Sequence, residues 1–280
     1  MTIKPKLQRF QTATAFACPI CQEALDLIQQ SLVCTNRHSF DLAKFGYVNL
    51  APQVKASKDY DKENFQNRQL VLENGFYDHI LTSLSECLSP LDHPANILDI
   101  GCGEGYYSRS LQERYPEHSF YAFDLSKESI QLAAKSDQEW KVKWFVGDLA
   151  RLPLLDQSMD LLLDIFSPAN YQEFKRVLAP DGRLIKVIPT AAHLQEIRQK
   201  VKDHLDQADY SNEQIIQHFS DHFTIENTIH CQETFELTPA LREALLSMTP
   251  LLFHVNPAQI DWNDLTQVTI SATILIGRSN

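Results

Sequence analysis

Short apolar runs alternate with segments of helical length over the central part of the chain. The runs have the Val, Ile, Leu and Phe content of buried strands, and they fall at Asn96–Ile100, Ser119–Phe123, Val142–Val146, Met159–Ile165 and Arg183–Ile188. Amphipathic segments lie between them at Tyr106–Arg114, Lys127–Ala134 and Tyr171–Leu178. Continuous apolar strands joined by helices indicate a parallel sheet that is covered on both faces.

The pattern changes in the C-terminal part of the chain. An amphipathic stretch, Ala191–Leu205, precedes two long strand candidates, His222–Leu237 and Thr266–Ile276, which flank a helix near Pro239–Met248. A terminal hairpin added to a parallel sheet is common in mixed sheets. The pattern therefore predicts an α/β fold with a mixed, seven-stranded sheet.

The N-terminal part has few helical signals and holds a cluster of Cys and His residues. Pro52–Asn64 is polar and rich in Lys and Asp, which is typical of a linker. We therefore expect a small metal-binding domain over residues 1–52, a linker with a helical lead-in over residues 53–94, and the α/β domain over residues 95–280.

The first strand of the α/β domain runs through Asp99 into three alternating glycines, Gly101, Gly103 and Gly105, before a helix begins. Glycine is needed where the backbone turns sharply and where a ligand approaches the main chain. A dinucleotide-binding fingerprint would need its third glycine at position 106, where this chain has Tyr. The spacing resembles instead the loop of class I methyltransferases, in which the amino-acid end of S-adenosylmethionine lies over the glycines.

Two further carboxylates support a cofactor site. Asp124 ends the second strand about 20 residues past the glycines, where a carboxylate can accept hydrogen bonds from both ribose hydroxyls. Asp148 follows the third strand, where this fold usually places a side chain near the adenine, although a turn or helix cap would explain it as well. All of these residues fall at carboxyl ends of strands, where open α/β sheets bind ligands. Cys102 is expected to pack under the loop.

A metal site is indicated by the spacing C-x2-C-x12-C-x3-H. Cys18, Cys21, Cys34 and His38 form two knuckles that would each present a pair of ligands to one ion. Three thiolates and one imidazole complete a tetrahedral shell typical of structural zinc, and four protein ligands leave no position for a catalytic water. A segment of this size needs the ion because it cannot bury enough apolar surface alone.

Charge is unevenly distributed along the chain. Residues 1–68 hold nine Lys or Arg and six Asp or Glu, a net +3, so the remaining residues carry −14 of the total −11. A basic head permits an anionic partner such as RNA, although chance explains the charge alone equally well. The chain shows neither an export signal nor a membrane-spanning run, so a cytoplasmic location without a membrane partner is expected.

Zinc knuckles followed by a methyltransferase loop closely resemble the RlmA family, whose members methylate N(1) of a guanine in the hairpin 35 region of bacterial 23S ribosomal RNA. The resemblance is carried by Arg37–Asp41, Ala43–Leu50 and Asp99–Tyr107. It continues through Arg151-Leu152-Pro153, Ser167-Pro168, Pro180-Asp181-Gly182 and Met248-Thr249-Pro250, and so covers nearly the whole chain.

The resemblance implies roles for individual residues. It assigns the zinc ligands to Cys18, Cys21, Cys34 and His38, and it adds Tyr77, Tyr107, Ser108 and His193 as cofactor contacts. It also implies a homodimer whose two heads frame an RNA cleft. From the pattern alone, Tyr77 would be a helix-face aromatic and His193 a solvated helix residue.

Guanine N(1) carries a proton, so the reaction calls for a proton acceptor. Asp164 and Asp148 are candidates because they lie near strand ends beside the cofactor loop. The chain differs from some relatives here, with an acid at position 164 in place of a base and without an extra Gly and Pro before His193. Tyr47, Phe65, Tyr77 and Phe166 are candidates for stacking on the target base, or simply core residues.

Two other functions fit parts of the pattern. The acidic body would suit a methyltransferase for a small molecule with the zinc module as a structural cap. A non-catalytic zinc-ribbon protein would also carry these knuckles, although the intact glycine loop and Asp124 argue against it.

Overall fold

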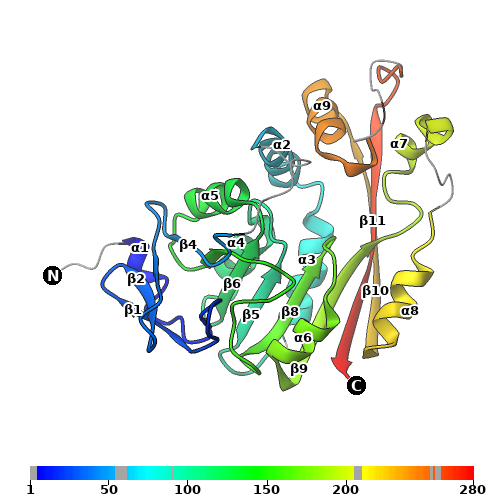
Figure 1. Ribbon diagram of the computed structural model, residues 1–280. Coiled ribbons are helices and arrows are strands. Elements are labelled where there is room, and N and C mark those ends of the chain that lie inside the picture. Colours follow the sequence, from blue (N-terminus) through cyan, green and yellow to red (C-terminus); the bar gives the residue numbers. More distant parts are fainter. Residues whose placement is uncertain (1–4, 54–61, 90, 205–209, 253–254, 256–259) are drawn as a thin grey trace.

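The computed structural model describes residues 5–53, 62–89, 91–204, 210–252, 255 and 260–280. Within these residues the central feature is an eight-stranded sheet with the order β10-β11-β9-β8-β5-β6-β7-β4 (Figure 1). The expected α/β architecture is confirmed, whereas the expected count of seven strands was one short. Most of the linker candidate at Pro52–Asn64 lies outside the described residues.

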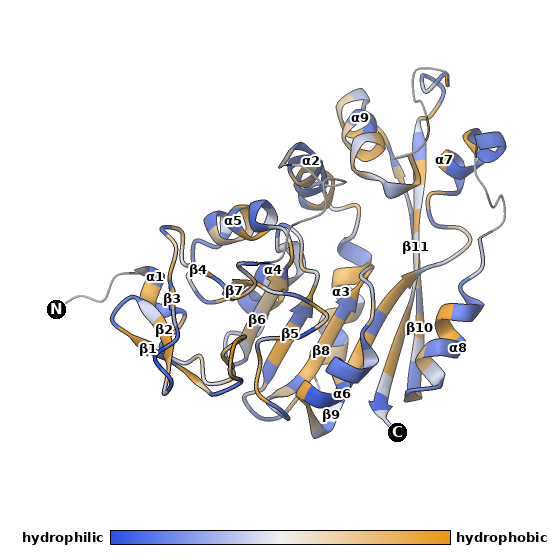
Figure 2. Ribbon diagram, viewed as in Figure 1, coloured by the Kyte–Doolittle hydropathy of each residue, from blue (hydrophilic) through white to orange (hydrophobic). Residues whose placement is uncertain are grey.

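The middle of the sheet is parallel and matches the apolar runs of the sequence. It consists of β5 (Asn96–Ile100), β6 (Ser119–Asp124), β7 (Lys143–Val146), β8 (Met159–Ile165) and β9 (Leu178–Pro189). Figure 2 shows these strands in largely hydrophobic colours. Alternate residues of β6 face two separate core clusters: Phe120 and Ala122 join one, Tyr121 and Phe123 the other.

Helices cover both faces of this sheet. The cluster on one face includes residues of α3 (Asp78–Leu88), α4 (Tyr106–Arg114), α5 (Lys127–Ser136) and α7 (Gln195–Lys200). The cluster on the other includes residues of α6 (Tyr171–Val177) and α8 (Glu213–Ser220). A 3-10 turn, η1 (Lys202–His204), follows α7. None of the helices in the described residues has the length and apolar character needed to cross a lipid bilayer.

The C-terminal part adds an antiparallel hairpin, as the sequence predicted. Strand β10 (Phe223–Glu236) pairs with β11 (Gln267–Ser279), and β11 pairs antiparallel with β9. Between them lie α9 (Pro239–Met248), which begins with Pro at its first turn and a Thr238 cap, and the turn η2 (Pro250–Leu252). Helix α9 packs against α2 (Lys62–Glu73).

The extra strand comes from the N-terminal part of the chain. After α1 (Pro5–Gln8), strands β1 (Leu25–Ile28), β2 (Ser31–Cys34) and β3 (Ser39–Asp41) form a small antiparallel sheet of their own. The next strand, β4 (Tyr47–Asn49), instead pairs parallel with β7 at the edge of the large sheet. Phe16, also fully buried, packs edge-on against Tyr121 and Phe145 at 5.2 Å. The head is therefore joined to the sheet by strand pairing and by aromatic packing.

Candidate active site and metal centre

The loop after β5 turns through three glycines with left-handed backbone, Gly101 (φ +66°), Gly103 (φ +57°) and Gly105 (φ +80°). A Cβ on Gly105 would lie 2.7 Å from Cζ3 of Trp144, so both packing and conformation require glycine there. At Gly103 the nearest atoms would be 3.7 Å away, in the Arg68 guanidinium. The loop is thus packed shut at Gly105 and open at Gly103, where a ligand can approach the backbone.

Two of the predicted carboxylates hold this loop. Asp99 accepts a hydrogen bond from Ser108 Oγ at 2.5 Å, and Asp124 accepts from the backbone amides of Gly103 (3.0 Å) and Ser126 (2.8 Å). Burial raises the pKa of Asp99 to about 7 and also raises the pKa of Asp124. Carboxylate oxygens accept more than one hydrogen bond, so Asp124 keeps acceptor capacity for a ligand.

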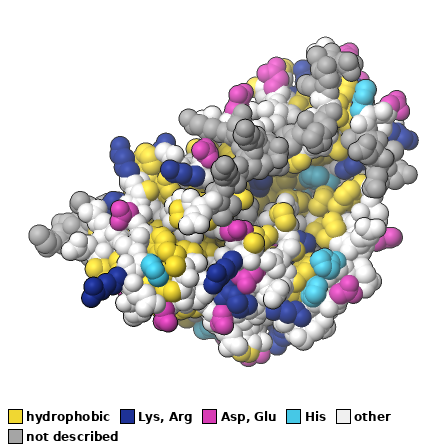
Figure 3. Space-filling model, viewed as in Figure 1, with side chains coloured by type: hydrophobic (Ala, Val, Ile, Leu, Met, Phe, Trp, Pro, Cys, Tyr) yellow, Lys and Arg dark blue, Asp and Glu magenta, His cyan; other side chains and the backbone are white. Residues whose placement is uncertain are grey.

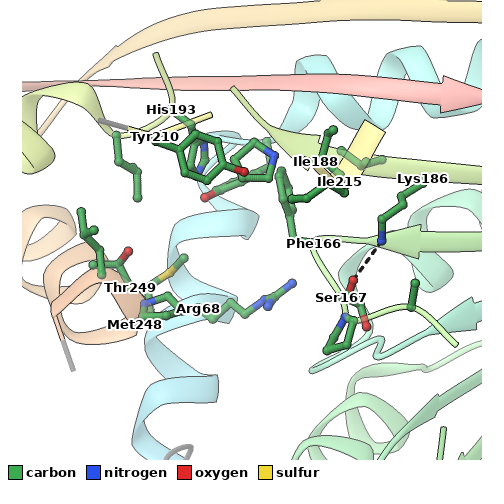
Figure 4. Close-up of a pocket in the computed structure, with 18 of the residues that line it drawn as sticks. Arg68, Phe166, Ser167, Lys186, Ile188, His193, Tyr210, Ile215, Met248 and Thr249 are labelled. Carbon is green, nitrogen blue, oxygen red and sulfur yellow. Dashed lines mark hydrogen bonds between the residues drawn. The ribbon is translucent and has the colours of Figure 1, made fainter. Parts of the chain in front are cut away.

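A cavity of about 1010 Å³ opens beside the loop (Figure 4). Its walls come from α2, the first turn of α4, the segment after β8, the end of β9, α8 and the end of α9. Three residues that the sequence assigned to the cofactor, Tyr77, Tyr107 and His193, line it together. His193 lies in the turn before α7 and not in a helix.

Aromatic rings form one wall of this cavity. Phe166 stacks on His193 with ring centroids 5.6 Å apart, and Tyr77 meets Phe166 edge-on at 6.1 Å. Nδ1 of His193 accepts from the Ser271 amide at 3.3 Å, which places the proton of the neutral ring on Nε2. Burial lowers the pKa of His193 to about 4, so the ring is uncharged at neutral pH. Phe166 adopts a left-handed backbone (φ +53°), and strain of this kind concentrates at functional sites.

The Tyr107 hydroxyl is buried in this wall and has no hydrogen-bond partner among the described residues. Burial raises the pKa of Tyr107 well above its ordinary value, and it raises the pKa of Tyr77 to about 12. Both phenols therefore keep their protons. A buried donor without a partner is costly, which fits a ligand that supplies the acceptor.

Two basic residues at the cavity were not predicted from the sequence. Arg68 on α2 lies 3.2 Å from the fully buried Glu104 of the glycine loop, and Lys186 on β9 forms an ion pair with Asp164. The pattern around Arg68 carries no signal. Lys186 could have been found, because a lysine within the apolar run Arg183–Ile188 needs a buried partner.

The remaining predicted residues lie outside the cavity wall. Ser108 is fully buried against Asp99. Asp148 is half-buried and accepts from the Ala150 amide at 2.8 Å, and Asp164 is fully buried behind Lys186. Neither aspartate lines the described cavity. Of the stacking candidates, Tyr77 and Phe166 line it, whereas Tyr47 and Phe65 are buried elsewhere.

The predicted metal ligands converge in the head. One ligand atom from each of Cys18, Cys21, Cys34 and His38 lies within 4.8 Å of all the others. The Sγ atoms of Cys18 and Cys34 lie 3.5 and 3.4 Å from Nδ1 of His38, and those of Cys21 and Cys34 are 3.7 Å apart. A zinc tetrahedron with bonds of about 2.3 Å to sulfur has edges close to these lengths. The four side chains therefore fit a zinc ion with little rearrangement.

Comparison with known proteins separates the two parts of the chain and then joins them. Residues 97–182 match the family described as Methyltransferase domain, and residues 16–58 match the family described as RlmA, N-terminal. A Bacillus subtilis protein named putative 23S rRNA (guanine-N(1)-)-methyltransferase YxjB is 34% identical over 97% of this chain and 99% of its own. The chain belongs to the RlmA family.

Other relatives agree with this assignment. The 23S rRNA (guanine(748)-N(1))-methyltransferase of Streptomyces fradiae is 26% identical over 93% of this chain and 95% of its own. The crystal structure of the Bacillus subtilis YcgJ protein shares the fold with a TM-score of 0.51, covering 72% of this chain and 98% of its own at 18% identity.

Membership in the RlmA family defines the two cofactors. The enzyme is an S-adenosylmethionine-dependent methyltransferase, and its Cys/His cluster is a zinc site. The open side of the loop at Gly103, the carboxylate of Asp124 and the unpaired hydroxyl of Tyr107 suit the methyl donor. Their individual contacts with it stay predictions.

Proposed function

We propose that this RlmA-family enzyme transfers a methyl group from S-adenosylmethionine to N(1) of a guanine in the hairpin 35 region of 23S ribosomal RNA. The names of its full-length relatives and the match of its zinc-binding head support this acceptor. The observation that carries the proposal is the cavity itself. It adjoins the glycine loop and has a wall of Tyr77, Phe166 and His193 rings, which suits a flat, unstacked base.

Bound S-adenosylmethionine supplies a methyl group that its sulfonium charge already activates. The protein therefore mainly has to orient the acceptor and exclude water. The neutral ring of His193 and the apolar wall around Phe166 avoid placing a second positive charge next to the donor. The left-handed turn at Phe166 brings the following residue, Ser167, against Gly101. Acceptor and donor sites thus meet at this contact.

Guanine must lose its N(1) proton during the reaction, and Asp164 and Asp148 remain the predicted acceptors. Asp164 lies nearer to the cavity because its partner Lys186 forms part of the wall. Asp148 follows β7, on the far side of β5 and β6.

A basic surface accompanies the proposed site. Figure 3 shows Lys and Arg side chains gathered between the N-terminal head and a hollow with a hydrophobic floor and His side chains near its rim. Arg37 beside the zinc ligands and Lys44 before β4 are exposed. We therefore expect the head to bind the RNA backbone. The homodimer and the cytoplasmic location are kept as predictions of this proposal.

The proposal is tested by methyl transfer from labelled S-adenosylmethionine. The purified protein is incubated with ribosomal RNA from a strain that lacks the gene, and separately with a metabolite extract. N(1) methylation blocks the pairing edge of guanine, so reverse transcription should stop at one guanine near hairpin 35. Label in the metabolite extract alone would favour the small-molecule enzyme, and failure to bind the cofactor would favour the non-catalytic protein.

A further inference from the structure

Lys186 places a charged group in an otherwise apolar part of the cavity wall. It lies on β9, between Ile185 and Val187, and only 4% of its surface is exposed. Its Nζ donates to Asp164 Oδ2 at 2.6 Å and to the backbone oxygen of Ser167 at 3.2 Å. Figure 4 shows the second of these bonds, with Lys186 reaching toward the segment after β8.

The contacts of this lysine leave one donor for a ligand. An ammonium group carries three N–H donors, and the two bonds to Asp164 and Ser167 use two of them. Asp164 is fully buried, and its second oxygen has no hydrogen-bond partner among the described residues. The pair is costly to bury, since its desolvation is only partly offset by mutual attraction. A role at the cavity explains why such a pair stands there.

The position of Lys186 relative to the methyl donor supports such a role. Ser167, which it holds, packs so closely against Gly101 that a Cβ on that glycine would lie 3.1 Å from Cβ of Ser167. The ammonium therefore lies at the junction between the glycine loop and the cavity. The other cations of the wall are engaged elsewhere: Arg68 faces Glu104, and Arg198 lies 5.1 Å from the centre of the Tyr210 ring.

Guanine chemistry calls for a donor at this place. When N(1) loses its proton, the negative charge is shared with O(6), and a preorganised donor there lowers the barrier. The proton leaves to solvent, the bond from sulfur to the methyl carbon breaks with its electron pair staying on sulfur, and N(1) forms the new bond to the methyl carbon. Lys186 keeps its own proton throughout.

We propose that Lys186 is a catalytic residue that donates a hydrogen bond to O(6) of the target guanine, and that Asp164 is the positioning residue that holds it there. This assignment rests on the proposed function. It gives Asp164 a task other than proton acceptance, and the two roles make different predictions for the same variants.

The experiment uses the full-length protein and two RNA fragments, one with guanosine and one with 6-thioguanosine at the target position. Sulfur is a weaker hydrogen-bond acceptor than oxygen. On guanosine, K186M should lower kcat about 100-fold, the usual effect of removing one such donor. The KM for RNA and the Kd for S-adenosylmethionine should stay within threefold, and K186R should recover part of the loss. On 6-thioguanosine the ratio between wild type and K186M should fall below tenfold.

A double-mutant cycle assigns Asp164. D164N should lower kcat in the wild type but not further in K186M, because a positioning residue acts through its partner. A further loss in D164N/K186M would assign Asp164 as the proton acceptor and overturn its positioning role. The double variant also leaves no unpaired buried charge, so it keeps the test valid if K186M fails to fold.

Two outcomes would reject the role of Lys186: a kcat of K186M within threefold of the wild type, or an equal loss on both RNAs. In either case the proposed function stands. If the wild type itself methylates neither fragment but binds S-adenosylmethionine, the acceptor was wrongly assigned and the proposed function fails instead.

Discussion

At the scale of single residues, Arg68 shows how a charge from a distant helix completes the glycine loop. Its guanidinium lies 3.7 Å from where a Cβ of Gly103 would be and 3.2 Å from Glu104. The class I resemblance places the amino-acid end of the methyl donor over these glycines. That end carries a carboxylate, for which a guanidinium is well suited.

We therefore predict that R68A weakens S-adenosylmethionine binding about 10- to 100-fold, as measured by calorimetry, since hydrogen bonds to charged groups contribute about 1.5–3 kcal/mol. R109A is a matched control. Arg109 on α4 pairs with Glu73 at 3.3 Å near the surface, where such pairs contribute little. Equal affinities of R68A and R109A would show that Arg68 does not contact the cofactor.

A second residue-scale prediction concerns Asp99, whose pKa burial raises from 3.8 to about 7. A carboxyl with a raised pKa contributes stability below its unfolded value that is lost as the pH rises through the folded value. D99N has no charge to bury. Its melting temperature relative to the wild type should therefore increase from pH 5 to pH 8, measured without cofactor. A difference that is constant over this range would contradict the ionisation of Asp99.

At the scale of elements, the sequence predicted best where a repeating pattern was long. Helices α4 and α9 begin and end where expected, and β8 matches its apolar run residue for residue. Strand β4 was missed because it has three residues and its partner β7 lies far along the chain. Periodicity cannot reveal a strand so short, whose place depends on a distant edge.

The glycine loop allows a prediction with an internal control. G105A should destabilise the protein by about 1–2 kcal/mol for its left-handed backbone and by about 1–3 kcal/mol more for the clash with Trp144. G103A has the same backbone cost without a clash, so it should lose only the first amount. Urea unfolding at equilibrium separates the two. Equal losses would mean that Trp144 moves aside.

At the scale of the whole molecule, the site is formed by segments far apart in the sequence. Tyr77 and His193 line the same cavity, yet neither stands out by its local pattern. The family resemblance named both, whereas Lys186 and Asp164 were linked only when the structure paired β8 with β9. Propensity and periodicity are local, and a cavity depends on how distant segments pack together.

The head and the body divide the work of the molecule, and removing the zinc should separate them. The ligands Cys18, Cys21, Cys34 and His38 hold β1 to β3, a sheet with few buried residues of its own. Phe16, by contrast, is anchored on Tyr121 and Phe145 without the metal. Loss of zinc should therefore unfold the small sheet and leave the glycine loop intact.

We predict that C34S, which removes one zinc ligand, weakens binding of a hairpin 35 fragment while the Kd for S-adenosylmethionine changes less than twofold. The slope of log K against log salt should also become shallower, by about 0.9 if each lost phosphate contact belonged to a double strand and about 0.7 for a single strand. C231S is the control, since Cys231 is also buried but lies on β10, away from the metal. If C34S kept its RNA affinity and salt slope after losing zinc, the grip on the RNA would have to come from the basic face of the body, and the zinc would serve only to fold the head.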